Sequence, residues 1–238
     1  MAKKRIAVLT GAGVSAESGF STFRDSGGLW AQYDPQVVAS IDGWYRDRGL
    51  LLDFYNGLRH QLRDARPNAA HYAIASLEKD YDVTVITQNV DNLHERAGST
   101  RVVHLHGELD KARPEHGVYD ESFSEAEVID LHYEDIRLGD KAPNGSQLRP
   151  HIVWFGEAVP EIERAIDYVS QADILLIVGS SLSVYPAAGL YRYAGPDCSV
   201  YVIDPQDVNL RHDKRITHIR EVATAGMPKF IEMISSPE

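Results

Sequence analysis

The chain has 238 residues, of which 43% are hydrophobic, and this is enough to bury the core of one large domain. Asp and Glu outnumber Lys and Arg by 35 to 24, so the net charge of -11 disfavours nucleic acid and membrane surfaces as partners and suits cationic protein segments. The single cysteine, Cys198, excludes an intramolecular disulfide and a cysteine-based zinc ribbon. Without a secretory leader or an apolar run near the roughly 20 residues of a membrane span, we expect a cytoplasmic protein.

Short apolar, β-branched runs alternate with helix-like stretches along the chain. In chain order, the expected strands are 6–10, 83–87, 101–105, 152–155, 174–178 and 199–203, and the expected helices are 50–62, 68–79, 161–170, 187–192 and 228–234. Such alternation is typical of an α/β fold, in which helices cover both faces of a parallel sheet. We therefore expect one parallel sheet as the framework of the molecule.

Two stretches interrupt this alternation. Between about residues 21 and 66 no short crossover joins the first two strands, and between about 108 and 150 an acidic segment punctuated by Gly and Pro replaces a helix. The expected division is a sheet domain of about 1–35, 66–108 and 150–238 and a smaller inserted lobe of about 36–65 and 109–149. Because ligands of open α/β sheets bind at the carboxyl ends of the strands, we expect the site in a cleft between sheet and lobe.

The first expected strand runs directly into a glycine-rich segment, GAGVSAESG, at residues 11–19. Its G-x-G-x-x-G/A pattern, at the opening of an expected helix, is typical of loops whose main-chain amides bind the diphosphate of a dinucleotide. The alternative is that the glycines only form a tight turn. Beyond the loop, Arg24 is placed to close over a diphosphate and Phe23 to shield a reactive sugar carbon from water. Taken alone, Arg24 in a surface ion pair and Phe23 in the core are the simpler interpretations.

Hydrogen-bonding side chains follow the second and third expected strands. The second strand leads into QNVDNLH at 88–94, and the third ends in HLHGE at 104–108. Strand ends are where such folds place catalytic groups, and a neutral histidine is a competent general base near pH 7. Strand alternation puts His104 and His106 on one face, so either is a candidate base, while His94 is a third candidate or a surface residue.

Taken together, six strings resemble the sirtuin family: GAGVSAESGFSTFRDSGGLW, TQNVDNLH, HLHGEL, RPHIVWFGEAVP, VGSSLSVYPAAG and VIDPQ, in this order along nearly the whole chain. The resemblance implies a Rossmann-type large domain and a smaller domain that usually carries a zinc ribbon. It also implies removal of acyl groups from protein lysines with NAD as the cofactor, which releases nicotinamide and O-acyl-ADP-ribose. The expected partners are acyl-lysine proteins or peptides, and we expect the enzyme to be a monomer.

Carried over residue by residue, the resemblance assigns roles within these motifs. His106 matches the catalytic histidine, and Asn89 and Asp91 match residues of the nicotinamide pocket. Motif and resemblance together give the expected NAD-contacting residues, which are Gly11, Ala12, Gly13, Ser15, Glu17, Phe23, Arg24, Gln88, Asn89, Asp91, Gly179, Ser180, Ser181 and Asp204.

The substrate side of the site is expected on a strand of the RPHIVWFGEAVP string. Val153, Trp154, Phe155 and Gly156 match the segment that pairs with the substrate backbone in the family. Such pairing uses main-chain hydrogen bonds, so it binds a peptide through its backbone. We therefore expect a protein or peptide substrate.

A helix of the expected lobe carries the residues that bear on acyl choice. The branch of the family that removes acidic acyl groups has Tyr and, three residues later, Arg; here Tyr55 is followed by Leu58, and Arg59 comes one residue later. Both positions lie near the face of Tyr55, so Arg59 is an expected substrate contact. The alternative is that Tyr55 and Leu58 form a core stripe with Leu51 and Leu62. We expect neutral acyl groups to be preferred.

Two further positions depart from the family pattern. No paired cysteines occur between residues 108 and 150, so we expect a zinc-free lobe with no metal site, and we interpret His116 and His132 as surface residues. In the VIDPQ string, Val202 stands in a strand end where the family often places Asn. Asp204 is expected to bind a ribose hydroxyl and to favour NAD over NADP.

Two other functions share parts of this pattern. An NAD hydrolase or mono-ADP-ribosyltransferase would use the same site but pass ADP-ribose to water or to a protein nucleophile, and the expected peptide-binding strand ranks it second. A non-catalytic NAD-binding module would keep the glycine loop without needing a base. The presence of His106 beside Gln88, Asn89 and Asp91 disfavours the binding module.

Overall fold

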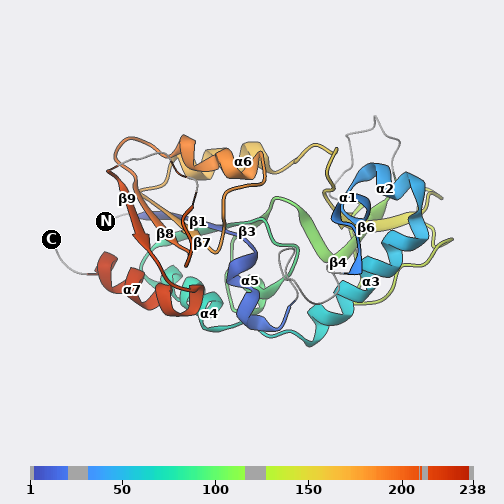
Figure 1. Cartoon of the computed structure of the whole chain (residues 1–238), viewed down its shortest axis with the longest axis horizontal. Helices are drawn as coiled ribbons and strands as arrows, with labels where there is room; N and C mark the ends of the chain where they lie inside the picture. The colour runs from blue at the N-terminus through green and yellow to red at the C-terminus, as the bar shows by residue number, and fades with distance from the viewer. Residues whose placement is uncertain (1–2, 21–31, 116–126, 209, 211–213, 236–238) are drawn as a thin grey trace.

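The computed structural model describes residues 3–20, 32–115, 127–208, 210 and 214–235. Its larger lobe is built on a six-stranded sheet with the order β3-β2-β1-β7-β8-β9, and all neighbouring strands run parallel (Figure 1). The strands are β1 (Arg5–Thr10), β2 (Asp82–Thr87), β3 (Val102–His104), β7 (Ile174–Val178), β8 (Ser199–Ile203) and β9 (Ile216–Ile219). The expected parallel α/β sheet is confirmed.

Successive side chains of the central strands point to opposite faces of this sheet. In β7, Leu175 packs into one core and Leu176 into the other. The covering elements are α6 (Ile162–Ser170) and the 3-10 helix η6 (Ala187–Tyr193) on the first face, and α4 (Ala69–Ser76) and α7 (Ala223–Ser235) on the second. Figure 1 shows α6 on the opposite side of the sheet from α4 and α7. Because both faces are covered, every residue of β7 is buried.

The smaller lobe is formed by the two stretches that interrupt the sheet. Its elements are α1 (Pro35–Val38), α2 (Ile41–Arg46), α3 (Arg48–Asp64) and the antiparallel strands β4 (Gly107–Pro114), β5 (Ile129–Asp130) and β6 (Leu148–Ile152), in the order β5-β4-β6. The Asp47 side chain caps α3 by accepting a hydrogen bond from the Leu50 N–H. Trp44, Phe54 and Trp154 are buried in an aromatic core that belongs to this lobe.

One expected strand belongs to a different sheet. Of the run predicted at 152–155, only Ile152 lies in a strand, and that strand is β6 of the antiparallel lobe. The Phe155 N–H donates to the Ala39 carbonyl, which also lies in the small lobe, at 2.8 Å. The segment is therefore bonded to the lobe and not to the parallel sheet, while the expected domain boundaries remain a prediction.

The expected long helices agree with the structure better than the short ones. The helices predicted at 50–62, 68–79 and 161–170 correspond to α3, to α4 with the 3-10 turn η4 (Leu77–Lys79), and to α6. The closing helix α7 starts at Ala223 and continues through Pro228, because buried Ala223 and Met227 extend its apolar face before the proline. The closing helix expected near residues 228–234 is therefore present, and it begins earlier than expected, at Ala223.

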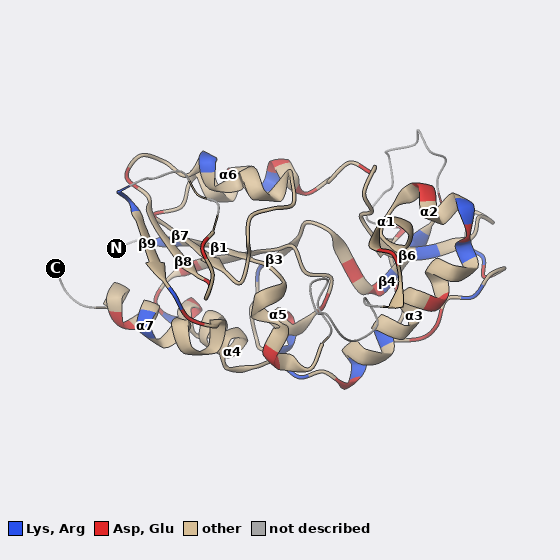
Figure 2. Cartoon of the chain, in the orientation of Figure 1, with Lys and Arg blue, Asp and Glu red and all other residues tan. Residues whose placement is uncertain are grey.

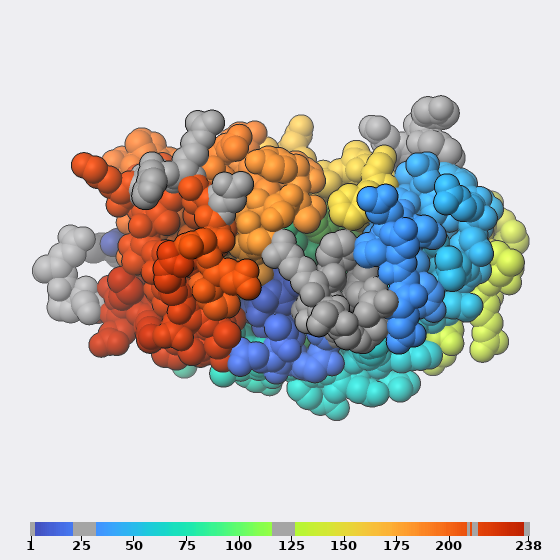
Figure 3. Space-filling view, viewed as in Figure 1, coloured from blue at the N-terminus to red at the C-terminus, as the bar shows by residue number. Residues whose placement is uncertain are grey.

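Charges are spread over both lobes. Figure 2 shows basic and acidic residues interspersed along α2, α3, α6 and α7. Among the described residues, no helix is long and apolar enough to cross a membrane. Figure 3 shows the turns after β1, in dark blue, at the surface between the two lobes.

Candidate active site

A cavity of about 580 Å³ opens at the carboxyl ends of β1, β2 and β7, and residues of both lobes line it. The expected site residues that line it are Gly11, Ala12, Gly13, Ser15, Glu17, Tyr55, Gln88, Asn89, Asp91, His106, Val153, Trp154, Phe155, Gly156, Gly179, Ser180, Ser181 and Asp204. Arg59 does not line it, and the expected contacts Phe23 and Arg24 lie outside the described residues. The fold therefore brings nearly all of the separate motifs to one place.

Two glycine-containing turns meet at the end of the sheet. The Gly11 N–H donates to the Val178 carbonyl at 3.1 Å, and the Gly13 N–H donates to the Gly179 carbonyl at 2.9 Å. A Cβ on Gly13 would lie 2.7 Å from the Gly179 Cα, and Gly179 itself has φ +60°. The turns after β1 and β7 can approach this closely only because both residues are glycine.

The turn after β1 does not open an α-helix as predicted. It forms two short 3-10 turns, η1 (Ala12–Val14) and η2 (Ala16–Ser18), and Gly19 ends the second with φ 72°. Short 3-10 turns leave main-chain N–H groups at their first residues without partners inside the turn. The N–H groups of Gly11 and Gly13 are used on β7 and the turn after it, so main-chain donors for a phosphate would come from other residues of this segment, without the dipole of a long helix.

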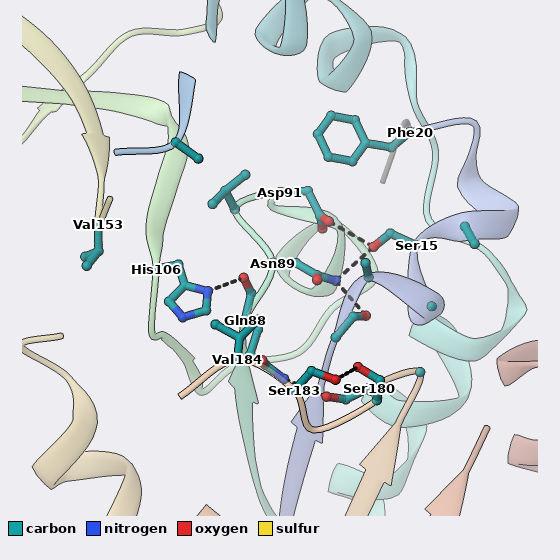
Figure 4. Close-up of a pocket in the computed structure, with 18 of the residues that line it drawn as sticks. Ser15, Phe20, Gln88, Asn89, Asp91, His106, Val153, Ser180, Ser183 and Val184 are labelled. Carbon is teal, nitrogen blue, oxygen red and sulfur yellow. Dashed lines mark hydrogen bonds between the residues drawn. The ribbon is translucent and has the colours of Figure 1, made fainter. Parts of the chain in front are cut away.

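A buried network joins this turn to the segment after β2 (Figure 4). The Asn89 Nδ2 donates to the Gly11 carbonyl at 3.1 Å and to Ser15 Oγ at 3.2 Å, and Ser15 Oγ donates to Asp91 Oδ2 at 2.8 Å. The other Asp91 oxygen accepts the Leu93 N–H at 3.1 Å. Burial raises the pKa of Asp91, while these hydrogen bonds oppose the shift. The network fixes a carboxyl group and an amide against the cavity.

His106 is the histidine whose ring lines the cavity. Its Nδ1 lies 2.8 Å from the Gln88 carbonyl oxygen, which can only accept, so Nδ1 carries the proton and Nε2 carries the lone pair. Burial lowers the pKa of His106, and the bond to Gln88 opposes the shift only in part. The ring is therefore neutral near pH 7, with Nε2 able to take up a proton.

The other two candidate histidines are already engaged elsewhere. His104 has Glu95 at 2.7 Å from Nε2 and the Asn89 carbonyl at 3.3 Å from Nδ1. Burial opposes protonation of His104, but the Glu95 carboxylate outweighs it and raises the pKa. His94 is fully buried, with Thr10 Oγ1 at 3.1 Å from Nε2, so its interpretation as a surface residue was wrong. Neither ring lines the cavity.

The segment 153–156 forms the wall of the cavity on the small-lobe side. Its Phe155 already uses both main-chain groups, because its N–H donates to Ala39 and its carbonyl accepts the Ile41 N–H at 3.0 Å. Within the described part of the chain, the Val153 carbonyl and the Gly156 N–H have no hydrogen-bond partner. These two groups are the ones left for the backbone of another molecule.

The helix α3 contributes Tyr55 and Leu58 to the cavity, but not Arg59. The Arg59 guanidinium is buried, and it donates from Nε to the Leu109 carbonyl at 2.9 Å and from Nη1 to Asn56 Oδ1 at 2.6 Å. The expected substrate contact of Arg59 is therefore not seen, because packing turns its side chain into the lobe. Leu58 occupies the position next to Tyr55 on the cavity side.

Several cavity residues were not among the expected site residues, although most of them lie within the recognised strings. They include Phe20, Val90, Val159, Ser183, Val184, Tyr185, Val222 and Ala223. Ser183 to Tyr185 follow directly after the recognised turn Gly179 to Ser181, so their position within the VGSSLSVYPAAG string was the available clue. Val222 and Ala223 stand at the start of α7, away from any motif.

Metal-binding side chains do not gather in the part of the chain that the structure describes. In this part there is no group of three or more His, Cys, Asp or Glu residues that could hold a metal ion. Cys198 is buried in the core of the large lobe, and His132 is exposed beside Asp130. His116 lies outside the described residues. The zinc-free lobe stays a prediction that rests on the single cysteine.

Known proteins resemble this chain over nearly its whole length. The model of the Sir2 family matches residues 11–186. A Bacteroides thetaiotaomicron protein named NAD-dependent protein deacylase is 52% identical, over 97% of this chain and 98% of its own. A solved structure of a Sir2 homologue with NAD has a TM-score of 0.83 at 35% identity, covering 98% of this chain and 90% of that one. Another, of Sir2 with a deacetylated p53 peptide and 3'-O-acetyl ADP ribose, has a TM-score of 0.79 at 29% identity, with coverage of 97% and 94%.

Proposed function

Since the chain belongs to the Sir2 family and is an NAD-dependent protein deacylase, we propose that the cavity between the two lobes is its active site and that His106 is the general base. The observation that carries this proposal is the placement of His106 against the cavity, with its Nδ1 2.8 Å from the Gln88 carbonyl oxygen; burial also lowers its pKa. A base of this kind is ready at neutral pH. It stands among the other motif residues that line the same cavity.

The residues at the strand ends have the chemistry that NAD requires. Gly13 and Gly179 let two main chains come close, and the Gln88 side chain donates to Ser180 Oγ at 2.8 Å beside them. We propose that these turns hold the diphosphate and that the Asp204 carboxylate, farther along the cavity, accepts a hydrogen bond from a ribose hydroxyl. When bound, NAD supplies an ADP-ribosyl group from which nicotinamide leaves.

His106, Asn89 and Asp91 have separate tasks in this proposal. His106 Nε2 takes a proton from a ribose hydroxyl, and the Gln88 carbonyl stabilises the imidazolium that results. The buried Asp91 carboxyl group orients the nicotinamide end and favours positive charge that develops there. Asn89, which donates to Gly11 and Ser15, links the segment after β2 to the turn after β1 beside the nicotinamide end. The expected roles of Phe23 and Arg24 in closing over NAD stay predictions.

The substrate is an acylated protein or peptide, and we propose that its backbone binds the segment 153–156. The open Val153 carbonyl and Gly156 N–H support this assignment, because an extended peptide needs one acceptor and one donor to align. The net charge of -11 suits lysine-rich substrate segments and disfavours nucleic acid. We also propose that the enzyme is a cytoplasmic monomer; light scattering of the purified protein can test the monomeric state.

The acyl group is proposed to be neutral. Leu58 lines the cavity beside Tyr55, and the nearby guanidinium of Arg59 is turned away to Leu109 and Asn56. The Tyr55 hydroxyl accepts the Trp154 indole N–H at 2.8 Å and keeps its own O–H as a neutral donor toward the cavity, so it supplies no positive charge. No cation among these cavity residues is therefore free to bind the carboxylate of a succinyl or malonyl group, and the apolar Leu58 favours acetyl or longer aliphatic chains.

One experiment tests this function against its nearest alternative. The protein is incubated with NAD and with acetyl-, succinyl- or longer acyl-lysine peptides, and the peptides and nucleotides are identified by mass spectrometry. We expect deacylated peptide, nicotinamide and O-acyl-ADP-ribose in equal amounts, with acetyl or longer neutral groups ahead of succinyl. Free ADP-ribose formed without peptide would instead indicate an NAD hydrolase, and ADP-ribosylated protein a transferase.

A further inference from the structure

A buried cluster of charged and aromatic residues adjoins the segment 153–156, and Glu157 and Trp154 of this cluster also line the cavity. We name it the Glu157 cluster, and it consists of Arg113, Arg149, Trp154 and Glu157. The Glu157 side chain is 17% exposed, while Arg149 and Arg113 are 5% and 7% exposed. Charges this deeply buried are retained only with close partners, so the contacts of Glu157 are informative.

Both oxygens of Glu157 are fully engaged. Oε1 accepts from Arg149 Nη1 at 2.6 Å and from Arg113 Nη2 at 3.3 Å, and Oε2 accepts from Arg149 Nη2 at 2.9 Å. The two bonds from Arg149 form a bidentate pair, which is the most directional arrangement of these groups. Oε2 also accepts the Trp154 main-chain N–H at 2.8 Å. Glu157 is therefore tied to two strands of the lobe and to the cavity wall at once.

The two arginines also bind a second main-chain group of this wall, the Ile152 carbonyl. Arg149 Nη2 donates to the Ile152 carbonyl at 2.9 Å, and Arg113 Nη2 reaches it at 3.4 Å. The Ile152 carbonyl and the Trp154 N–H point to the same side of an extended chain, away from the groups of Val153. The cluster therefore binds the main-chain groups of Ile152 and Trp154 and makes no hydrogen bond to the Val153 carbonyl.

Trp154 connects the cluster to Tyr55, which we assign to the binding of the acyl group. The Arg149 guanidinium lies 3.6 Å from the centre of the Trp154 ring, and the indole N–H donates to the Tyr55 hydroxyl at 2.8 Å. Tyr55 belongs to α3 and lines the cavity. The Glu157 carboxylate is therefore connected both to the segment 153–156, which we assign to the peptide backbone, and to Tyr55, which we assign to the acyl group.

Glu157 also neutralises charge that the lobe could not otherwise bury. Burial, with the repulsion of Arg149, lowers the pKa of Arg113 to about 10. Burial alone would raise the pKa of Glu157, but the hydrogen bonds and charge of Arg149 hold it below its ordinary value. The carboxylate is therefore ionised at neutral pH. Its loss would leave two buried cations beside the wall without a counter-charge.

We propose that Glu157 is a positioning residue for peptide binding, which acts through Trp154 and Ile152 to set the segment 153–156 in the form that binds the substrate backbone. The inference rests on the proposed function of that segment. It assigns Glu157 no contact with the reacting atoms, because both of its oxygens are used within the lobe. It therefore predicts a change in peptide affinity without a change in chemistry or NAD binding.

A second ion pair in the same lobe provides a matched control. Glu115 pairs with Arg48, whose guanidinium lies 5.7 Å from the centre of the Trp44 ring, so the pair resembles that of Glu157 in residue types and aromatic neighbour. Glu115 does not line the cavity, and it is not bonded to the segment 153–156. Glu115→Gln removes a carboxylate from the lobe without touching the wall.

The test compares Glu157→Gln and Glu115→Gln in steady-state kinetics, with peptide and NAD varied separately. We expect Glu157→Gln to raise the peptide KM about tenfold while kcat and the NAD KM stay within about twofold. Glu115→Gln should leave all three near wild type. An unchanged peptide KM in Glu157→Gln, or an equal loss in all three parameters, would overturn the positioning role.

A second variant and the wild-type activity complete the test. Should Glu157→Gln fail to fold, Glu157→Asp keeps the charge but shortens the side chain, so it cannot serve Arg149 and Trp154 together, and the same rise in peptide KM is expected. Wild-type protein that removes no acyl group would overturn the proposed function and this inference with it. Normal wild-type turnover with an unaffected Glu157→Asp peptide KM would overturn the inference alone.

Discussion

The two walls of the cavity are held in different ways. On the side of the parallel sheet, main-chain contacts and uncharged hydrogen-bond donors connect Gly13, Gly179, Ser15 and Asn89. On the side of the small lobe, an ion-pair cluster and stacked aromatic rings hold the segment 153–156. The sheet wall carries His106 and the turns that we assign to NAD, whereas the lobe wall carries the residues that we assign to peptide and acyl group.

This difference indicates a division of labour. Short main-chain contacts allow little variation, as suits groups that must meet one cofactor in one geometry. Side-chain clusters can change one residue at a time, as suits recognition of different acyl groups and peptides. Substitutions in the sheet wall should therefore act on kcat or on NAD, and substitutions in the lobe wall on peptide KM or acyl preference. The following variants are ordered by the size of the effect that we expect.

The largest effect is expected for His106→Ala. Loss of the general base should lower kcat about 10³-fold, within the range usual for such residues. NAD binding should remain near wild type, because His106 makes its hydrogen bond to Gln88 and not to the glycine turns. Steady-state kinetics with calorimetric titration of NAD measure the two effects separately. Retained turnover would remove His106 from the role of base.

Gly13→Ala should disrupt the contact between the turns after β1 and β7 in the sheet wall. The new Cβ would lie 2.7 Å from the Gly179 Cα, so the two turns must separate, and the free energy of unfolding should fall by about 1–3 kcal/mol. NAD affinity should fall with it. Gly195→Ala is the control, because the nearest atom to its Cβ would be 3.9 Å away. Denaturant titrations and NAD binding should separate the two variants, and equal stability would contradict the close contact.

The sheet wall was the easier of the two walls to predict from the sequence. The strands β7 and β8 match the runs predicted at 174–178 and 199–203, because continuous apolar runs between turn residues are typical of buried parallel strands. The motif residues of the sheet wall were also found, since each motif is continuous in sequence. Choosing among three histidines by pattern was not possible, because the hydrogen bonds that engage His104 and His94 come from other elements of the fold and leave no local pattern.

The lobe wall was harder to predict. The strand β4, with the sequence GELDKARP, has no apolar alternation and was missed, since its Lys and Arg side chains pair with acids within the lobe. Arg59 lies one position beyond Leu58, and only packing shows that its side chain turns inward. The Glu157 cluster combines residues of three separate segments, so no local pattern reveals it.

Leu58→Arg should change the acyl preference of the lobe wall. A guanidinium at this position would stand beside Tyr55 in the cavity and offer a charge-assisted bond to an acidic acyl group. We expect the ratio of kcat/KM for succinyl- over acetyl-lysine peptide to rise about tenfold. Leu58→Met, which nearly conserves volume, should leave the ratio unchanged. An unaltered ratio in Leu58→Arg would show that the acyl group lies elsewhere.

The smallest effect is expected in the pH profile of the wild-type enzyme. Burial lowers the pKa of His106 below 6.5, so the neutral base form predominates near pH 7 and is lost as the pH falls through this lower pKa. A plot of log kcat/KM against pH should therefore be level above pH 7 and decline below a midpoint that lies under 6.5. A midpoint above 6.5 would contradict a neutral, buried His106.

The division between the two walls is tested most directly by kinetics of His106→Ala and Glu157→Gln side by side, with NAD and an acetyl-lysine peptide varied in the same assay. We predict a loss of kcat at unchanged NAD affinity for His106→Ala, and a raised peptide KM at nearly unchanged kcat for Glu157→Gln. The division would be contradicted if His106→Ala and Glu157→Gln lowered kcat to the same extent. It would also be contradicted if both variants raised only the peptide KM.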